Sequence, residues 1–63
     1  FFIEDDGIVL VDYKSDHVRE AETLIGRYRK QLELYAEALE KITGLRVKEK
    51  LIYSIILEQA IPV

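Results

Sequence analysis

Two charged residues, Asp12 and Lys14, follow four apolar residues, Ile8 to Val11, in the stretch GIVLVDYKSD. Such an apolar run is typical of a strand buried on both faces, and residues two apart in a strand lie on the same face. The carboxylate and the ammonium would then lie side by side at the strand exit, with Cα atoms about 6.6 Å apart. That spacing suits metal-dependent phosphodiester cleavage, in which both groups act on one reacting centre.

Each residue of this stretch could contribute a different group to such a reaction. A hard divalent cation such as Mg²⁺ prefers oxygen ligands and keeps several of its waters. Asp12 can supply a carboxylate oxygen, and Tyr13 can supply its backbone carbonyl. Lys14 can hold or polarise the attacking water and offset negative charge on the phosphate. The alternative interpretation is a solvent-facing ion pair, which would contribute about 0 to 1 kcal/mol of stability.

The residues before this strand predict a β-hairpin. Asp6 and Gly7 lie between two apolar runs and favour a two-residue type I′ turn, which needs positive φ at both positions. In that register Tyr13 and Lys14 have no partner in this chain. The expected pairs are Asp5 with Ile8, Ile3 with Leu10, and Phe1 with Asp12.

An amphipathic helix is predicted from Tyr28 to Thr43. Apolar residues recur there at helical spacing and form one stripe, made of Tyr28, Leu32, Tyr35, Leu39 and Ile42. Gly44 stands where a left-handed C-cap is expected. A shorter helical pattern precedes Tyr28, and Gly26 is expected to interrupt the helix between the two patterns.

The closing stretch RVKEKLIYSIIL changes from alternation to a nearly continuous β-branched run and predicts a strand from Leu51 to Leu57. The order strand, strand, helix, strand predicts an α/β fold: a β-hairpin, a long amphipathic helix and a further strand in one mixed sheet. The 63 residues form at most one domain. Since the chain opens on apolar residues, we expect residues 1–63 to be the distal part of a single domain, truncated at its N-terminal side. An unpaired apolar first strand also predicts self-association.

Composition narrows the possible functions. The net charge of −3 gives no basic surface of the kind that an autonomous DNA-binding domain shows. There is no cysteine and only one histidine, His17, which argues against a disulfide framework or a cysteine-based zinc site. No apolar run reaches about 18 residues, so no transmembrane helix is predicted. We expect a cytoplasmic protein without membrane contact, and no Walker motif is present to bind ATP.

Gln31 and Tyr35 in the stretch QLELY are neighbours at i and i+4 on one helix face. They could reach over the sheet edge toward Lys14, or Tyr35 could simply belong to the apolar stripe.

Together, GIVLVDYKSD, YRKQLELYAEALEKITG and LIYSIIL resemble the C-terminal nuclease domain of RecB-family enzymes, within the PD-(D/E)XK superfamily. The likeness is strongest to the AddA-type or RexA-type subunits of ATP-dependent helicase–nucleases.

This resemblance implies a restriction-endonuclease-like fold and a DNA exonuclease that uses Mg²⁺, or Mn²⁺, to process double-strand DNA ends for recombinational repair. Asp12 and Lys14 match the acidic and lysine members of the family motif. Gln31 and Tyr35 match its Q-x-x-x-Y helix motif, which the resemblance implies contacts DNA and supports the site. It also implies a second subunit of the AddB or RexB type, and ATP hydrolysis in separate motor domains.

One expected feature has no match in the sequence. The family uses an earlier acidic ligand in a G-I-I-D-like stretch, and nothing between Phe1 and Asp6 matches it. In the predicted hairpin register, the position opposite Lys14 lies two residues before Phe1. We therefore expect residues 1–63 alone to be inactive as a nuclease. Two other interpretations stay open: a nuclease-like module that has lost catalysis and docks on a partner, or another nuclease of the superfamily. The absence of cysteine counts against the CRISPR-associated type with an iron–sulfur cluster.

Overall fold

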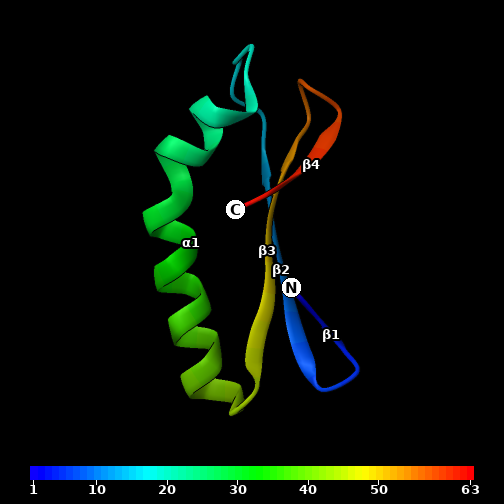
Figure 1. Ribbon diagram of the computed structural model, residues 1–63, viewed down its shortest axis with the longest axis vertical. Coiled ribbons are helices and arrows are strands. Elements are labelled where there is room, and N and C mark those ends of the chain that lie inside the picture. Colours follow the sequence, from blue (N-terminus) through cyan, green and yellow to red (C-terminus); the bar gives the residue numbers. More distant parts are fainter.

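A computed structural model, which describes residues 1–63, shows one four-stranded sheet with a single helix on one face (Figure 1). The strands lie in the order β1-β2-β3-β4; β2 and β3 are parallel, and each outer strand is antiparallel to its neighbour. The predicted α/β architecture with one mixed sheet is confirmed, and β4 is an additional strand. The elements are β1 (Phe2–Glu4), β2 (Gly7–Lys14), α1 (Ala21–Thr43), β3 (Arg46–Ser54) and β4 (Gln59–Pro62).

The parallel pair β2 and β3 forms the centre of the sheet, and α1 is the crossover between them. Parallel strands need such a connection because a tight turn cannot join them. Lys14 pairs with Ser54, so the C-terminal ends of both strands lie side by side at one end of the sheet. The expectation that Tyr13 and Lys14 lack a partner is wrong, because β3 supplies one for each.

The hairpin forms as expected, but its predicted register is wrong. The turn residues are Asp5 and Asp6, and the observed pairs are Phe2 with Val9, Ile3 with Ile8, and Glu4 with Gly7. Asp5 carries the positive φ of the turn, at 57°, a conformation that a short polar side chain tolerates. Gly7 instead begins β2, where an added Cβ would lie 2.9 Å from the Lys48 Cδ. The glycine therefore permits the close approach of a neighbouring side chain rather than the turn.

Helix α1 is longer than predicted. It runs without a break from Ala21 to Thr43, so the expected interruption at Gly26 is wrong. Gly26 is exposed, and a Cβ added there would meet no atom within 4 Å, so the helix simply continues through it. The predicted C-cap is confirmed: Gly44 has φ 72° and its N–H donates to the Glu40 carbonyl. Helix α1 does not combine the length and hydropathy needed to cross a membrane.

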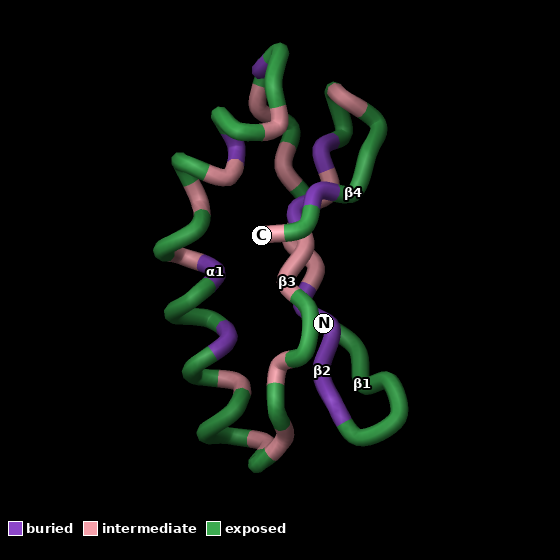
Figure 2. The backbone as a smooth tube through the Cα atoms, in the orientation of Figure 1, coloured by how far each residue is buried: buried purple, intermediate pink, exposed green.

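The core lies between α1 and the sheet, and the outer face of α1 is exposed (Figure 2). Two members of the predicted stripe, Tyr35 and Ile42, are 49% and 81% exposed. Ala36 takes the buried position instead, because the face against the sheet follows i, i+4 steps through Leu24 and Leu32. The buried residues that pack together there are Leu10, Val18, Leu24, Leu32, Ala36, Ile52 and Ile61.

The predicted strand from Leu51 to Leu57 is present as the second half of β3, which begins at Arg46 with the alternating residues, but its predicted end is wrong because β3 stops at Ser54. Ser54 is fully buried, and its Oγ accepts a hydrogen bond from the Leu57 N–H at 3.0 Å, which stabilises a turn. The β-branched run therefore leaves the sheet at the turn. The chain returns as β4, which ends at Pro62 and lies at the sheet edge, where proline is tolerated.

Strand β1 forms the opposite edge of the sheet and covers little of its neighbour. It pairs only with the first three residues of β2, from Gly7 to Val9. Phe1, Phe2 and Ile3 are each at least half exposed, at 62%, 50% and 57%. An apolar edge of this kind is open to pairing with another strand. The self-association expected from the sequence stays a prediction.

Candidate active site

Asp12 and Lys14 lie together at the end of β2, as the strand period predicts. The Lys14 Nζ is 3.2 Å from the Asp12 Oδ2, and the two side chains are 21% and 23% exposed. Both side chains face α1, since the Lys14 Nζ also lies 4.2 Å from the centre of the Tyr28 ring. The pair is therefore enclosed between the sheet and the helix and differs from a solvent-facing ion pair.

One oxygen of Asp12 is buried beside Lys14. This Oδ2 lies 3.2 Å from the Lys14 ammonium, which compensates its charge, although the angles of the contact are not those of a hydrogen bond. A carboxylate oxygen can accept from more than one group. The Asp12 Oδ2 can therefore pair with Lys14 and still bind a second ligand that carries positive charge.

Tyr13 turns its side chain to the other face of the sheet. Its ring is 66% exposed and packs against the Tyr53 ring, with centroids 5.6 Å apart. The Lys14 carbonyl accepts a hydrogen bond from the Ile55 N–H, on the β3 side of β2. Successive carbonyls of a strand point to opposite sides, so the Tyr13 carbonyl points to the side that β1 leaves uncovered.

Gln31 and Tyr35 lie one turn apart on α1, but in different surroundings. Gln31 is half-buried, and its Oε1 is the second buried side-chain acceptor in the chain without a hydrogen-bond partner. Tyr35 is 49% exposed. The contact with Lys14 expected from this helix is made by Tyr28, one turn before Gln31. Gln31, which the sequence selects, thus has a buried acceptor without a hydrogen-bond partner.

Asp16, Arg27 and Tyr28 form a hydrogen-bonded cluster beside the end of β2 that the sequence does not predict. Asp16, in the segment between β2 and α1, accepts hydrogen bonds at its Oδ2 from the Tyr28 hydroxyl at 2.7 Å and from Arg27 at 2.9 Å. These bonds, first from Tyr28 and then from Arg27, lower the pKa of Asp16, and the bond to Asp16 raises the pKa of Tyr28. No periodicity links a loop residue to the helix, so only the fold brings these residues together.

The hairpin register fixes where a further acidic group could face the pair. Phe2 lies opposite Val9, so each step back along β1 matches one step forward along β2. The position opposite Lys14 would therefore lie four residues before Phe1, and not two as the predicted register required. Cross-strand partners share a face of the sheet, so a residue there would face the same side as Asp12 and Lys14.

The oxygen atoms at the C-terminal end of β2 are of the type that a hard divalent cation binds. The buried carboxylate oxygen of Asp12 and the outward Tyr13 carbonyl are both oxygen ligands of the type that Mg²⁺ binds. No three histidine, cysteine or acidic side chains gather anywhere in the chain. The residues present thus offer part of a cation site rather than a complete coordination shell.

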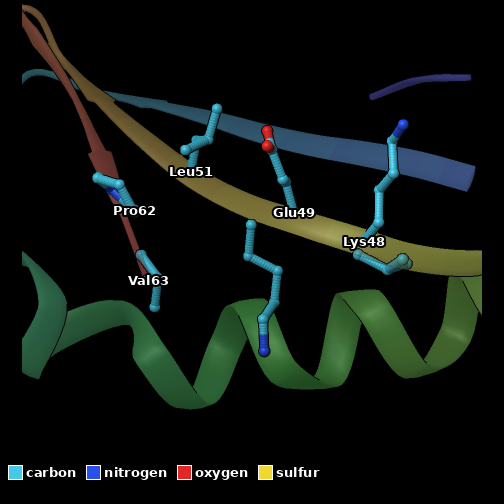
Figure 3. Close-up of a pocket in the computed structure, with 7 residues that line it drawn as sticks. Lys48, Glu49, Leu51, Pro62 and Val63 are labelled. Carbon is cyan, nitrogen blue, oxygen red and sulfur yellow. The ribbon is translucent and has the colours of Figure 1, made fainter. Parts of the chain in front are cut away.

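The one groove of the chain lies away from this pair, along the first half of β3 (Figure 3). Its volume is about 290 Å³. Figure 3 shows the side chains of Lys48 and Glu49 pointing away from α1, and Val63 pointing toward it. Lys48 is the extra residue where the register between β2 and β3 shifts. The lining residues are Val47, Lys48, Glu49, Lys50, Leu51, Pro62 and Val63.

Most of the chain is similar to proteins named as the A subunits of ATP-dependent helicase/nucleases. Over 55 residues, 84% of the chain, it is 58% identical to the one from Thermoanaerobacter sp. (strain X514) and 51% identical to the one from Clostridium novyi (strain NT). It is 49% identical over 53 residues to the one from Clostridium botulinum (strain Hall). The chain spans 4% of the length of each of these relatives. No family model and no solved structure matches the chain.

Proposed function

We propose that residues 1–63 form the distal part of a nuclease domain in one subunit of an ATP-dependent helicase–nuclease. The observation that carries this proposal is the Asp12–Lys14 pair, whose ammonium and buried carboxylate oxygen lie 3.2 Å apart between the sheet and α1. It lies at the carboxyl ends of two parallel strands, where open α/β sheets commonly bind ligands. The similarity to the A subunits of ATP-dependent helicase/nucleases supports the same assignment.

In this function, Asp12 and the Tyr13 carbonyl would hold a divalent cation, Mg²⁺ or Mn²⁺. When bound, such a cation polarises a phosphoryl oxygen and makes a bound water a better nucleophile. Lys14 orients the attacking water through its ammonium and offsets the negative charge that develops on the phosphate. Gln31 and Tyr35 support the site from α1 and contact DNA. The bond that breaks is a phosphodiester P–O bond, and water supplies the new oxygen on phosphorus.

The remaining parts of the proposal concern the polypeptide as a whole. ATP hydrolysis belongs to motor domains outside residues 1–63, and a second subunit of the AddB or RexB type is the protein partner. The reaction is exonucleolytic processing of double-strand DNA ends for recombinational repair. Residues 1–63 alone supply one carboxylate and one carbonyl at the site, so we expect this chain in isolation not to degrade DNA with Mg²⁺ or Mn²⁺.

The test replaces Asp12 in the full-length polypeptide that contains residues 1–63. Linear duplex DNA is incubated with Mg²⁺ and ATP, and both DNA degradation and ATP-driven unwinding are measured. Asp12→Ala should abolish degradation and leave unwinding nearly intact, because the nuclease and motor sites are separate. The matched control is Asp6→Ala, which removes an exposed carboxylate from the hairpin turn and should leave both activities unchanged. Normal degradation by Asp12→Ala would overturn the proposal and favour a docking module.

A further inference from the structure

Lys14 has a second neighbour besides Asp12, and that neighbour comes from the helix. The Lys14 Nζ lies 4.2 Å from the centre of the Tyr28 ring and 3.2 Å from the Asp12 Oδ2. The face of an aromatic ring attracts a cation at this distance. Lysine has a flexible four-carbon stem, so a ring on one side and a carboxylate on the other restrict where the ammonium can lie.

The Tyr28 ring is itself held in place by its hydroxyl. That hydroxyl donates to the Asp16 Oδ2 at 2.7 Å, and Arg27 donates to the same oxygen at 2.9 Å. Asp16 lies in the segment that follows β2, so the bond joins this segment to α1. Tyr28 therefore touches the strand exit at two points, with its ring face on Lys14 and its hydroxyl on Asp16.

We propose that Tyr28 is a positioning residue, whose ring face holds the Lys14 ammonium beside Asp12 for phosphodiester cleavage. This inference rests on the proposed nuclease function, and it adds a residue that neither the strand motif nor the helix motif includes. Tyr28 acts through Lys14 and touches neither DNA nor metal. The hydroxyl bond to Asp16 plays a secondary part, because it fixes the ring and leaves the cation contact to the ring face.

The test compares three replacements of Tyr28 in the full-length polypeptide that contains residues 1–63. Phe keeps the ring face and loses the hydroxyl, whereas Leu and Met keep apolar volume and lose the ring. Rates are measured on linear duplex DNA with Mg²⁺ and ATP, over a range of DNA concentrations. ATP-driven unwinding reports whether each variant is folded. Tyr53→Leu is the matched control, since this half-buried tyrosine packs on the other face of the sheet.

Tyr28→Leu and Tyr28→Met should each lower the nuclease kcat by about 10- to 100-fold, the range expected when a reacting group is misplaced. The KM for DNA should stay unchanged, because Tyr28 does not touch the substrate. Tyr28→Phe should keep most of the wild-type rate, which a role carried by the hydroxyl would not allow. Tyr53→Leu should keep the wild-type rate.

A double variant shows whether Tyr28 acts through Lys14. Lys14→Ala should lower the rate by about a hundredfold or more, and the residual rate of Lys14→Ala/Tyr28→Leu should equal that of Lys14→Ala alone. A further loss in the double variant would show that Tyr28 acts independently of Lys14. Wild-type nuclease rates in Tyr28→Leu and Tyr28→Met, with Lys14→Ala impaired, would overturn the role of Tyr28 alone. Equal losses in Tyr28→Phe, Tyr28→Leu and Asp16→Asn would also overturn it, because the hydroxyl bond would then be the cause. Wild-type nucleolysis by Lys14→Ala would overturn the proposed function itself.

Discussion

Two lysines lie at opposite ends of the central strand pair, and their surroundings differ. Lys48 belongs to β3 and lies beside the start of β2. Its Nζ is 3.0 Å from the Glu4 Oε1 and 3.8 Å from the Asp5 Oδ2. Those carboxylates belong to the hairpin and are well exposed, at 58% and 87%. The bond to Glu4, ahead of the other nearby acids, raises the pKa of Lys48. This end of the sheet carries a surface ion-pair network.

Lys14, at the other end, has one carboxylate partner and one aromatic partner, and both are partly buried. Its ion pair joins two residues of the same strand, whereas the Lys48 pairs join β3 to the hairpin. The Asp12 Oδ2 is buried, whereas the carboxylates beside Lys48 are largely exposed. The same residue types can thus form an exposed ion-pair network or a partly buried pair, and burial distinguishes the two.

The difference between the two lysines is tested most directly by replacing each of them in turn. In the full-length polypeptide, Lys14→Ala should lower nuclease activity by about a hundredfold or more, because the ammonium no longer stabilises charge on the phosphate. Lys48→Ala should leave the nuclease rate unchanged. Both rates are measured on linear duplex DNA with Mg²⁺ and ATP. Equal losses in the two variants would show that the two ends do not differ in function.

The unsatisfied acceptor of Gln31 gives a test that separates stability from activity. Gln31→Leu should raise the free energy of unfolding by about 1 kcal/mol, because it removes a buried acceptor without a partner. It should also lower the nuclease rate of the full-length polypeptide, though less than Lys14→Ala does. Denaturant unfolding and DNA degradation are the two measurements. Gln59→Leu, at an exposed position of β4, is the control. A loss of stability in Gln31→Leu would contradict the prediction.

A substitution of Gly26, away from both lysines, should change the stability of the fold and leave nuclease activity unchanged. Gly26 is in the helix interior and exposed, with open space where a Cβ would be added. Gly26→Ala should therefore raise the free energy of unfolding by about 0.5 to 1 kcal/mol, since glycine loses more backbone freedom than alanine on folding. Nuclease activity should be unchanged. The prediction is wrong if urea unfolding shows no gain, or if activity changes together with stability.

The two ends should also lose their contributions at opposite extremes of pH. The pKa of Asp16 is lowered in the fold, so its stabilising effect is present above pH 3.8 and is lost as pH falls through the lowered value. The pKa of Lys48 is raised, so its effect is present below pH 10.5 and is lost as pH rises through the raised value. Melting temperatures of Asp16→Asn and Lys48→Met, followed against pH beside the wild type, should converge with it at low and high pH respectively. Constant differences across the whole range would contradict both assignments.

The sequence predicts the elements better than their limits. The apolar run identifies β2, and Gly44 identifies the end of α1, because these signals arise within a few neighbouring residues. The hairpin register could not be predicted, because Gly7 is required by Lys48 from a distant strand and not by the turn. Likewise, β3 ends at Ser54 because of a buried hydroxyl bond that periodicity does not reveal.

The candidate site divides in the same way. Strand period alone places Asp12 beside Lys14, and that part is confirmed by their 3.2 Å separation. The roles assigned to Gln31 and Tyr35 stay predictions. The sequence predicts Tyr28 only as a member of the apolar stripe, yet it joins Lys14 to Asp16. That contact depends on how α1 lies across the sheet, which no local pattern specifies.

The parallel pairing of β2 and β3 also has a consequence for folding kinetics. The turn of β1–β2 and that of β3–β4 close short loops, whereas pairing Lys14 with Ser54 must wait until the whole of α1 has crossed the sheet. Closing a long loop costs more entropy, and contacts distant in sequence form slowly. We expect the strand exit to order late, with substitutions at Ser54 changing the unfolding rate more than the folding rate in stopped-flow measurements. On a ribosome, Asp12 and Lys14 would be synthesised before α1 and β3, and they would be enclosed between the helix and the sheet only after β3 had emerged.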